Sequence, residues 1–184
     1  MRIISGKLKG RSVLVPKNFG GRPTTDFARE GLFNVLHNLI DLQGLRVLDL
    51  FAGTGAFGLE CMSRGATSAR FVELSPLHVK FIADNIRHFE LKNALVTKGD
   101  VFKSISSIHE KFDLIFADPP FDLDALDKLP DMILKSDLLA EHGIFVLEHG
   151  RNQEFSQHPF FLQHRKYSNV HFSFFSKELS DEEE

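Results

Sequence analysis

Segments typical of buried strands alternate with segments typical of helices from residue 45 to residue 148. The strand-like segments are short apolar runs, and the segments between them carry apolar residues at helical spacing. The expected strands are Leu45–Phe51, Ala69–Leu74, Ala94–Lys98, Phe112–Ala117 and Gly143–Glu148. The expected helices are Ala56–Arg64, Pro76–Phe89, Val101–Ile108 and about Leu123–Leu139. Strands joined by helices in this way predict a parallel sheet covered on both faces.

Further elements are expected at both ends of this pattern. Phe160–Gln163 and Val170–Phe175 read as two strands that are antiparallel, because too few residues separate them for a helical crossover. Arg2–Val15 predicts two short strands and a turn, and residues 16–23 predict a loop.

A helix is expected to begin at Asp26, where Thr24, Thr25 or Asp26 can cap its first turn. The apolar residues expected close to one face of this helix are Phe27, Leu32, Phe33, Leu36 and Ile40. The whole pattern predicts an α/β, doubly wound, mostly parallel seven-stranded sheet of the Rossmann-like kind, with an N-terminal hairpin and helix. We divide the chain into a basic hairpin, residues 1–25, a domain, residues 26–177, and an acidic tail, residues 178–184, expected to be disordered.

The composition is that of a water-soluble globular chain: 42% of its 184 residues are hydrophobic and 26% are charged. No segment resembles a signal peptide, and no apolar run reaches the roughly 18 residues of a membrane helix. A single cysteine, Cys61, excludes an internal disulfide. We therefore expect a cytoplasmic protein without a membrane partner.

Positive charge is concentrated in the first 25 residues, which contain no acidic residue. These basic residues are Arg2, Lys7, Lys9, Arg11, Lys17 and Arg22. Neutralising phosphates releases counterions, so such an arm is a candidate RNA-binding element. The alternative is a solvated basic hairpin with no partner, and charge alone does not separate the two.

A glycine-rich segment, Gly53-Thr54-Gly55-Ala56-Phe57-Gly58, follows the first expected strand and opens a helix. Glycines in this position let the backbone approach a ligand at the helix N-terminus. Glu73 lies twenty residues beyond Gly53 at the end of the next strand, where an acid holds ribose hydroxyls in dinucleotide-binding proteins. A nicotinamide dehydrogenase is therefore one candidate, and a structural turn without a ligand is another.

Asp49, four residues before the first glycine, favours a different ligand. A carboxylate gains nothing beside a pyrophosphate, but it suits the sulfonium and ammonium groups of S-adenosylmethionine. The hydride-transfer machinery is also missing, because Tyr167 has His171 four residues later instead of a lysine. The loop therefore favours the methyl donor.

The segment Asp118-Pro119-Pro120-Phe121 leaves the carboxyl end of the fourth expected strand. An exocyclic amino nitrogen on a base is a poor nucleophile, because its lone pair is delocalised into the ring. The Asp118 carboxylate and a main-chain carbonyl, that of Pro119, can accept its two N–H groups and free the lone pair, while the prolines stiffen the turn. Phe121 offers a flat face for the base. Asp-Pro-Pro is also good turn chemistry, so a purely structural turn is the alternative.

With these motifs in order, the chain resembles the RsmD-type family of bacterial small-subunit (16S) ribosomal RNA guanine-N2 methyltransferases, which are class I S-adenosylmethionine-dependent enzymes. The resemblance covers roughly Arg2 to Phe175. The segments that carry it are Arg2–Lys7 with Lys9–Arg11, Arg22–Asp26 with Arg29-Glu30 and Leu32–Asn34, Asp49–Gly55, Phe71–Glu73 and Asp118–Phe121. Ser5 and Ser168 depart from it, since glycine is expected at both positions.

The resemblance implies roles for particular residues. Asp49, Gly53 and Gly55 would line the methionine end of the cofactor, and Glu73 would bind its ribose. Asp100 and the Val101 N–H would meet the adenine. Thr25 and Arg29 would close the site, Asp118 would orient guanine N2, and the basic arm would grip RNA within an assembling small subunit.

Three other functions remain open at this point: a DNA adenine-N6 methyltransferase, a non-catalytic RNA-binding factor on the same scaffold, and the dehydrogenase. We expect a monomer and no metal site, because the nine histidines show no pair at ligand spacing on one helix. Cys61 is expected to be a buried apolar residue. The sequence assigns no role to Glu148 and does not identify the modified nucleotide.

Overall fold

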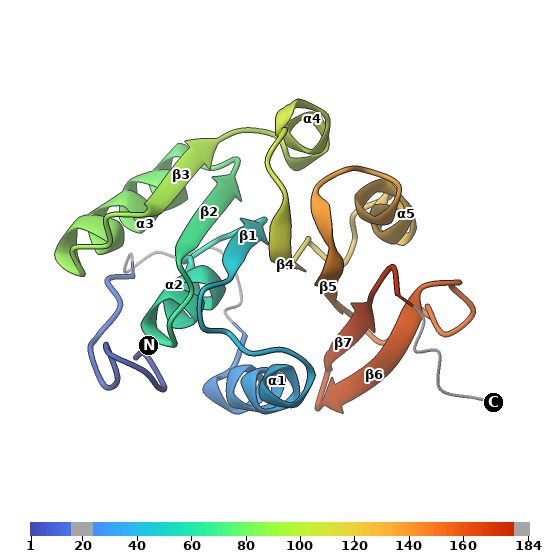
Figure 1. The fold of residues 1–184 in the computed structure, drawn as a ribbon, viewed down its shortest axis with the longest axis horizontal. Helices are drawn as coiled ribbons and strands as arrows, with labels where there is room; N and C mark the ends of the chain where they lie inside the picture. Colours follow the sequence, from blue (N-terminus) through green and yellow to red (C-terminus); the bar gives the residue numbers. More distant parts are fainter. Residues whose placement is uncertain (16–23, 179–184) are drawn as a thin grey trace.

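A seven-stranded sheet organises the molecule, in the order β3-β2-β1-β4-β5-β7-β6 (Figure 1). The computed structural model describes residues 1–15 and 24–178. The strands are β1 (Arg46–Leu50), β2 (Ser68–Glu73), β3 (Ala94–Lys98), β4 (Phe112–Ala117), β5 (Leu139–His149), β6 (Phe161–Tyr167) and β7 (Val170–Phe175). β1 to β5 are parallel, whereas β7 is antiparallel to both of its neighbours, β5 and β6. The predicted mostly parallel seven-stranded sheet is confirmed.

Helices cover both faces of this sheet. They are α1 (Asp26–Leu39), α2 (Ala56–Ser63), α3 (Pro76–His88), α4 (Val101–Ser107), the 3-10 helix η1 (Leu126–Lys128) and α5 (Leu129–Leu134). Side chains alternate along each strand, so Val47 joins a hydrophobic cluster with α1, α2 and α3, while Leu48 joins a second cluster with α4, η1 and α5. The hydrophobic core therefore consists of two layers, one on each face of the sheet.

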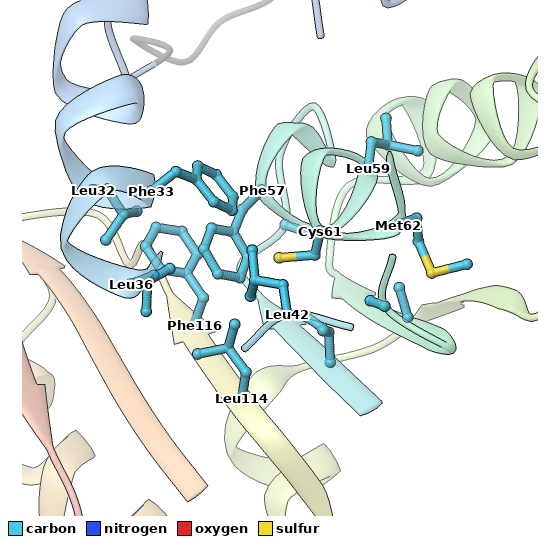
Figure 2. Close-up of a cluster of buried hydrophobic side chains, with 14 of the residues drawn as sticks. Leu32, Phe33, Leu36, Leu42, Phe57, Leu59, Cys61, Met62, Leu114 and Phe116 are labelled. Atoms are coloured by element: carbon cyan, nitrogen blue, oxygen red, sulfur yellow. The ribbon is translucent and has the colours of Figure 1, made fainter. Parts of the chain in front are cut away.

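Stacked aromatic rings connect α1, α2 and β4 within the first cluster (Figure 2). The centroid of the Phe57 ring lies 5.3 Å from that of Phe33 and 4.1 Å from that of Phe116. Cys61 is buried in the same cluster, as expected of an apolar residue. This packing fixes the start of α2 relative to β4, and so fixes the glycine loop relative to the Asp-Pro-Pro-Phe segment.

The helix predicted over about Leu123–Leu139 is wrong in extent. The structure has η1 followed by the six residues of α5, and β5 begins at Leu139 instead of Gly143. Pro130 can stand only in the first turn of a helix, so it sets where α5 begins. The Ser136 hydroxyl donates to the Ile133 carbonyl at the other end.

Phe27 was wrongly assigned to the buried face of α1, because its side chain is 71% exposed. The buried positions of this helix include Ala28, Leu32 and Leu36, at four-residue spacing, and Phe27 precedes that row by one residue. Its ring instead meets the edge of the Tyr167 ring at a centroid distance of 5.7 Å. Thr25 caps the helix by accepting from the Ala28 N–H, as one of the three predicted caps.

Within residues 1–15 the amino-terminal arm contains a single isolated bridge, Arg2 with Ser12, where two short strands were predicted. Buried side chains of α2 hold this backbone instead: Glu60 accepts from the Ile4 and Ser5 N–H groups at 2.8 and 2.9 Å. Gly6 approaches so closely that an added Cβ would lie 1.9 Å from the Ser63 carbonyl oxygen. Residues 16–23, predicted as a loop, lie outside the described residues.

Candidate functional site

Four neighbouring strands place polar side chains at one edge of the sheet. β1, β2, β4 and β5 are parallel and adjacent, so their carboxyl ends meet there. Ligands of open α/β sheets bind at this edge. The predicted residues Asp49, Glu73 and Asp118 lie at the ends of β1, β2 and β4, and the structure brings them to this edge.

The loop between β1 and α2 has the unusual backbone that the glycines predicted. Gly53 has φ +54° and Gly55 has φ +73°, in the left-handed region that glycine enters without strain. Phe51 also has a positive φ, 54°, which costs a non-glycine residue on the order of 1–3 kcal/mol. Such strain is typical of ligand-binding turns, where neighbouring structure maintains it.

Asp49 contacts α2 directly. Its carboxylate is 1% exposed and accepts from the Gly58 N–H at 3.0 Å. Burial raises the pKa of Asp49 well above its usual value, and the nearby carboxylates Asp118 and Glu73 raise it further. Gly58 is needed because an added Cβ would lie 2.4 Å from the Phe71 ring. The third glycine of the pattern therefore serves helix–strand packing.

Glu73 ties the glycine loop to the next strand. One carboxylate oxygen accepts from the Gly53 N–H and the other from the Ser75 N–H, both at 2.8 Å. The Gly99 N–H donates to the Glu73 main-chain carbonyl at 3.0 Å, which brings the loop after β3 alongside. In that loop the Asp100 side chain caps α4 by accepting from the Lys103 N–H. Val101 is buried at the first position of this helix.

Arg29 is buried beneath the arm, with 2% of its surface exposed. Its Nη2 donates to the Arg2 carbonyl at 2.6 Å and to the Asp26 carboxylate at 2.9 Å. Its Nε and Nη1 have no hydrogen-bond partner among residues 1–15 and 24–178. Burial lowers the pKa of Arg29. In the structure Arg29 joins α1 to the arm, and its predicted role in closing the site stays a prediction.

The Asp118 N–H extends the sheet ladder by donating to the Leu50 carbonyl at 3.3 Å. Burial raises the pKa of the Asp118 carboxyl to about 7. Within the described part of the chain this carboxyl has no hydrogen-bond partner, so its acceptors remain for a ligand. Pro119 is buried, Pro120 is exposed, and the Leu123 N–H closes a turn onto the Pro120 carbonyl at 3.0 Å.

Phe121 lies half-exposed at the same edge, with 43% of its surface accessible. Its ring lies close to the backbone that follows β5, because a Cβ added to Gly150 would be 3.2 Å from Phe121 Cδ2. The ring is thus held on one side and open on the other, as a stacking platform requires.

The residue that the sequence left without a role, Glu148, belongs to this edge. It is 3% exposed, and the Thr24 hydroxyl donates to its Oε2 at 2.7 Å. Burial raises the pKa of Glu148 well above its usual value, and the Asp118 charge raises it further. The sequence feature that could have identified Glu148 as a site residue is its position as an acid directly after the apolar run Phe145-Val146-Leu147.

His149 stabilises the end of β5. Burial lowers its pKa to about 4, so the ring is neutral. Nδ1 lies 2.8 Å from the Gly150 carbonyl and must donate to it, whereas Nε2 lies 2.8 Å from the Ser173 hydroxyl.

No group of three metal-ligating side chains occurs within residues 1–15 and 24–178. No helix of that part of the chain is long and apolar enough to cross a membrane.

The basic residues of the described arm, Arg2, Lys7, Lys9 and Arg11, are exposed. The Arg11 guanidinium lies 4.8 Å from the centroid of the Phe89 ring and donates to the His88 carbonyl, so it is partly engaged within the protein. Lys17 and Arg22 were also predicted to bind RNA, and both lie outside the described residues.

The sheet order separates two of the candidate classes. Dinucleotide-binding sheets have the order 3-2-1-4-5-6, whereas here an antiparallel strand, β7, lies between β5 and β6. A solved structure of the Thermus thermophilus 16S rRNA N2 G1207 methyltransferase, in complex with AdoMet and guanosine, shares the fold with a TM-score of 0.69 and 25% identity. The match covers 84% of this chain and 44% of that one. Fold and site together define a class I S-adenosylmethionine-dependent methyltransferase.

The family follows from the sequence comparisons. The family model described as "Conserved hypothetical protein 95" matches residues 1–176. YlbH of Bacillus subtilis is 37% identical over 158 residues, which cover 84% of this chain and 85% of YlbH. Ribosomal RNA small subunit methyltransferase D of Escherichia coli K12 is 34% identical over 149 residues, 80% of this chain and 74% of that protein. The chain belongs to this family, the RsmD-type ribosomal RNA methyltransferases, which confirms the resemblance and contradicts the dehydrogenase alternative.

Proposed function

We propose that this protein transfers a methyl group from S-adenosylmethionine to the exocyclic N2 amino group of a guanine in small-subunit ribosomal RNA. The observation that carries the proposal is the Asp118 carboxyl, partly exposed at the end of β4 beside the glycine loop and without a side-chain hydrogen bond in the described chain. The names of the relatives support the substrate, since one is a ribosomal RNA small subunit methyltransferase and another acts on N2 of a 16S guanine.

The cofactor supplies an electrophilic methyl group on a sulfonium. The edge suits this cation, because the carboxyl groups of Asp49, Glu73 and Asp118 lie together there. We propose that Asp49, Gly53 and Gly55 line the methionine end of the cofactor. Asp49 contributes partly indirectly, because its hydrogen bond with the Gly58 N–H holds the start of α2 in place. Each oxygen of Glu73 already accepts one N–H, and His78 Nδ1 lies 3.5 Å from Oε1, so Oε2 keeps the acceptor capacity that would bind a ribose hydroxyl.

We propose the remaining cofactor contacts because the residues concerned lie near Glu73 or near Glu148. Asp100 and the Val101 N–H begin α4 next to Glu73, where an adenine would lie beyond the ribose. Thr25 is the N-cap of α1 and Arg29 lies in its first turn, and Thr24, just before the cap, reaches Glu148 at the same edge.

In the proposed reaction, Asp118 and the Pro119 carbonyl accept the two N–H groups of guanine N2, and Phe121 stacks on the base. The nitrogen lone pair then forms the new N–C bond while the S–C bond breaks and its electron pair stays on sulfur. The nitrogen releases one proton, and the Asp118 carboxylate is positioned to receive it.

The function is tested by incubating the pure protein with isotopically labelled S-adenosylmethionine and small-subunit particles or RNA from cells that lack it. Nuclease digestion and mass spectrometry of the RNA should give labelled N2-methylguanosine. Labelled N6-methyladenosine, or label in DNA alone, would support one of the alternatives instead.

Methyl transfer should depend on pH through Asp118. Only the ionised carboxylate accepts hydrogen bonds at both oxygens, and desolvation by the surrounding protein disfavours that form. Because its pKa is raised to about 7, single-turnover rates should increase with pH through that value. Below this pH the single-turnover rate should decrease, approaching about a tenfold decrease for each pH unit. Asp118→Asn should abolish this dependence, and a flat wild-type profile from pH ~5.5 to ~8.5 would contradict it.

We propose further that residues 1–25 form an RNA-binding arm on the domain of residues 26–177. Lys7→Glu with Lys9→Glu should weaken RNA binding and lower the slope of log affinity against log salt by up to about 1.8, roughly 0.9 for each phosphate that is no longer neutralised. A matched control reverses Lys128 and Lys135, exposed residues at the two ends of α5, which packs on the face of the sheet away from the arm. Equal effects of the two pairs in a salt titration would refute an arm-specific role.

The proposed setting is the cytoplasm, with the protein acting as a monomer on an assembling small subunit. A domain of residues 26–177 with a short arm covers few nucleotides, so neighbouring ribosomal proteins would help to hold its target in place. Faster transfer to partly assembled particles than to protein-free RNA would support this setting, and light scattering would determine the oligomeric state.

A further inference from the structure

Glu148 and Asp118 occupy equivalent positions on neighbouring strands. In the parallel register of β4 and β5, Phe116 pairs with Val146 and Ala117 with Leu147. Continuing that register by one residue places Asp118 beside Glu148 at the carboxyl edge. The electrostatic effect of Asp118 on Glu148 agrees with this closeness.

Both carboxyl groups keep acceptor capacity. Among the described residues, Asp118 has no side-chain hydrogen bond, and Glu148 has one, which the Thr24 hydroxyl makes to Oε2. Oε1 of Glu148 is therefore available. Two carboxyl groups that lie side by side with free acceptors at a ligand-binding edge of the sheet indicate donors supplied by a ligand.

The proposed substrate has donors in that arrangement. On the Watson–Crick edge of guanine, the N1–H lies next to the N2 amino group, and enzymes that act on extruded bases read this edge by hydrogen bonds. We infer that Glu148 accepts the N1–H of the target guanine through Oε1 while Asp118 accepts from N2, so that Glu148 selects guanine over bases that present an acceptor at N1. This inference rests on the proposed function.

Thr24 and Phe121 position the two partners of this contact. The Thr24 hydroxyl holds Oε2, which leaves Oε1 as the free acceptor of Glu148. Phe121 lies against the backbone at Gly150, two residues beyond Glu148, so a base stacked on its ring would present its edge to the end of β5. Adenine would place its N1 lone pair against the carboxylate, which leaves both groups unsatisfied.

The test uses RNA with guanine or 2-aminopurine at the mapped target position. 2-Aminopurine keeps the N2 amino group, lacks O6 and has a lone pair in place of the N1–H, so the change of the ratio between wild type and Glu148→Gln isolates the N1 contact. Wild-type protein should transfer to 2-aminopurine about 5- to 150-fold more slowly than to guanine, the discrimination of one good polar base contact. In Glu148→Gln the side-chain NH2 can donate to that lone pair, so the ratio should fall to near one.

A structural role for Glu148 would slow both substrates equally and leave their ratio unchanged, and that result would overturn the inference. Equal wild-type rates on the two bases would also overturn it, without any variant needing to fold. Thr24→Val, which frees Glu148, should reduce the ratio in part. If the wild type methylated no guanine N2, the proposed function itself would fail, which is a separate outcome.

Discussion

Asp118→Ala should lower the single-turnover rate of methyl transfer by about 10²- to 10³-fold, the usual effect of deleting one preorganised polar group at a reacting centre. The carboxyl makes no side-chain hydrogen bond within the described chain, so its loss should leave folding and S-adenosylmethionine affinity nearly unchanged. The rate is measured on ribosomal RNA or assembling subunits at saturating cofactor, with calorimetry for the affinity.

Two further variants make this result specific. Asp118→Asn should retain more activity than Asp118→Ala, because the amide oxygen still accepts one hydrogen bond. Asp124→Ala removes an exposed acid from the following loop and should transfer methyl groups like the wild type. Near wild-type transfer by Asp118→Ala would mean that the Asp-Pro-Pro-Phe segment is only a turn.

Glu60→Ala should reduce the free energy of unfolding by about 3–5 kcal/mol, as expected when one partner of a buried ion pair is removed. Its side chain is fully buried and accepts from the Ile4 and Ser5 N–H groups and from Arg64 Nε at 2.8 Å. All three donors would lose their acceptor. Chemical denaturation followed by circular dichroism measures the change.

Glu110→Ala is the matched control for this variant. Glu110 forms an ion pair with Arg70 at 3.0 Å, but its side chain is 65% exposed. Exposed pairs contribute about 0–1 kcal/mol, so this substitution should change stability little. A comparable loss in the two variants would show that the arm is not anchored through Glu60.

The central parallel strands were predictable because strands buried on both faces are continuous apolar runs. β3, β4 and β7 have the predicted bounds, and β1 and β2 differ by one residue at each end. The start of β5 was missed, since Leu138-Leu139-Ala140 continues the apolar character of the preceding helix. No local signal separates helix from strand in such a short run.

The arm and Phe27 show where tertiary packing overrides local pattern. The arm alternates like a strand, but Glu60, Ser63 and Asn85, 55 to 71 residues away, bind its backbone. Phe27 lies against the ring of Tyr167, and this ring packs over Gly31. A Cβ at position 31 would lie 2.3 Å from the Tyr167 ring, so only glycine fits there. That contact also explains the glycine inside α1.

The candidate site was predictable where it consists of strand ends in chain order, as with Asp49, Glu73 and Asp118. Glu148 could not be assigned in this way. Its partner Thr24 is 124 residues away, and its closeness to Asp118 depends on the register between β4 and β5. No local sequence motif indicates the contact with Thr24 or the register between β4 and β5.

The most direct test of the central claim is mass mapping of modified nucleotides in small-subunit ribosomal RNA from cells with and without this protein. The proposed function predicts that one N2-methylguanosine disappears without the protein and returns when the wild-type gene, but not Asp118→Ala, is restored. An unchanged set of N2-methylguanosines, with loss of a modification elsewhere or of none, would contradict it.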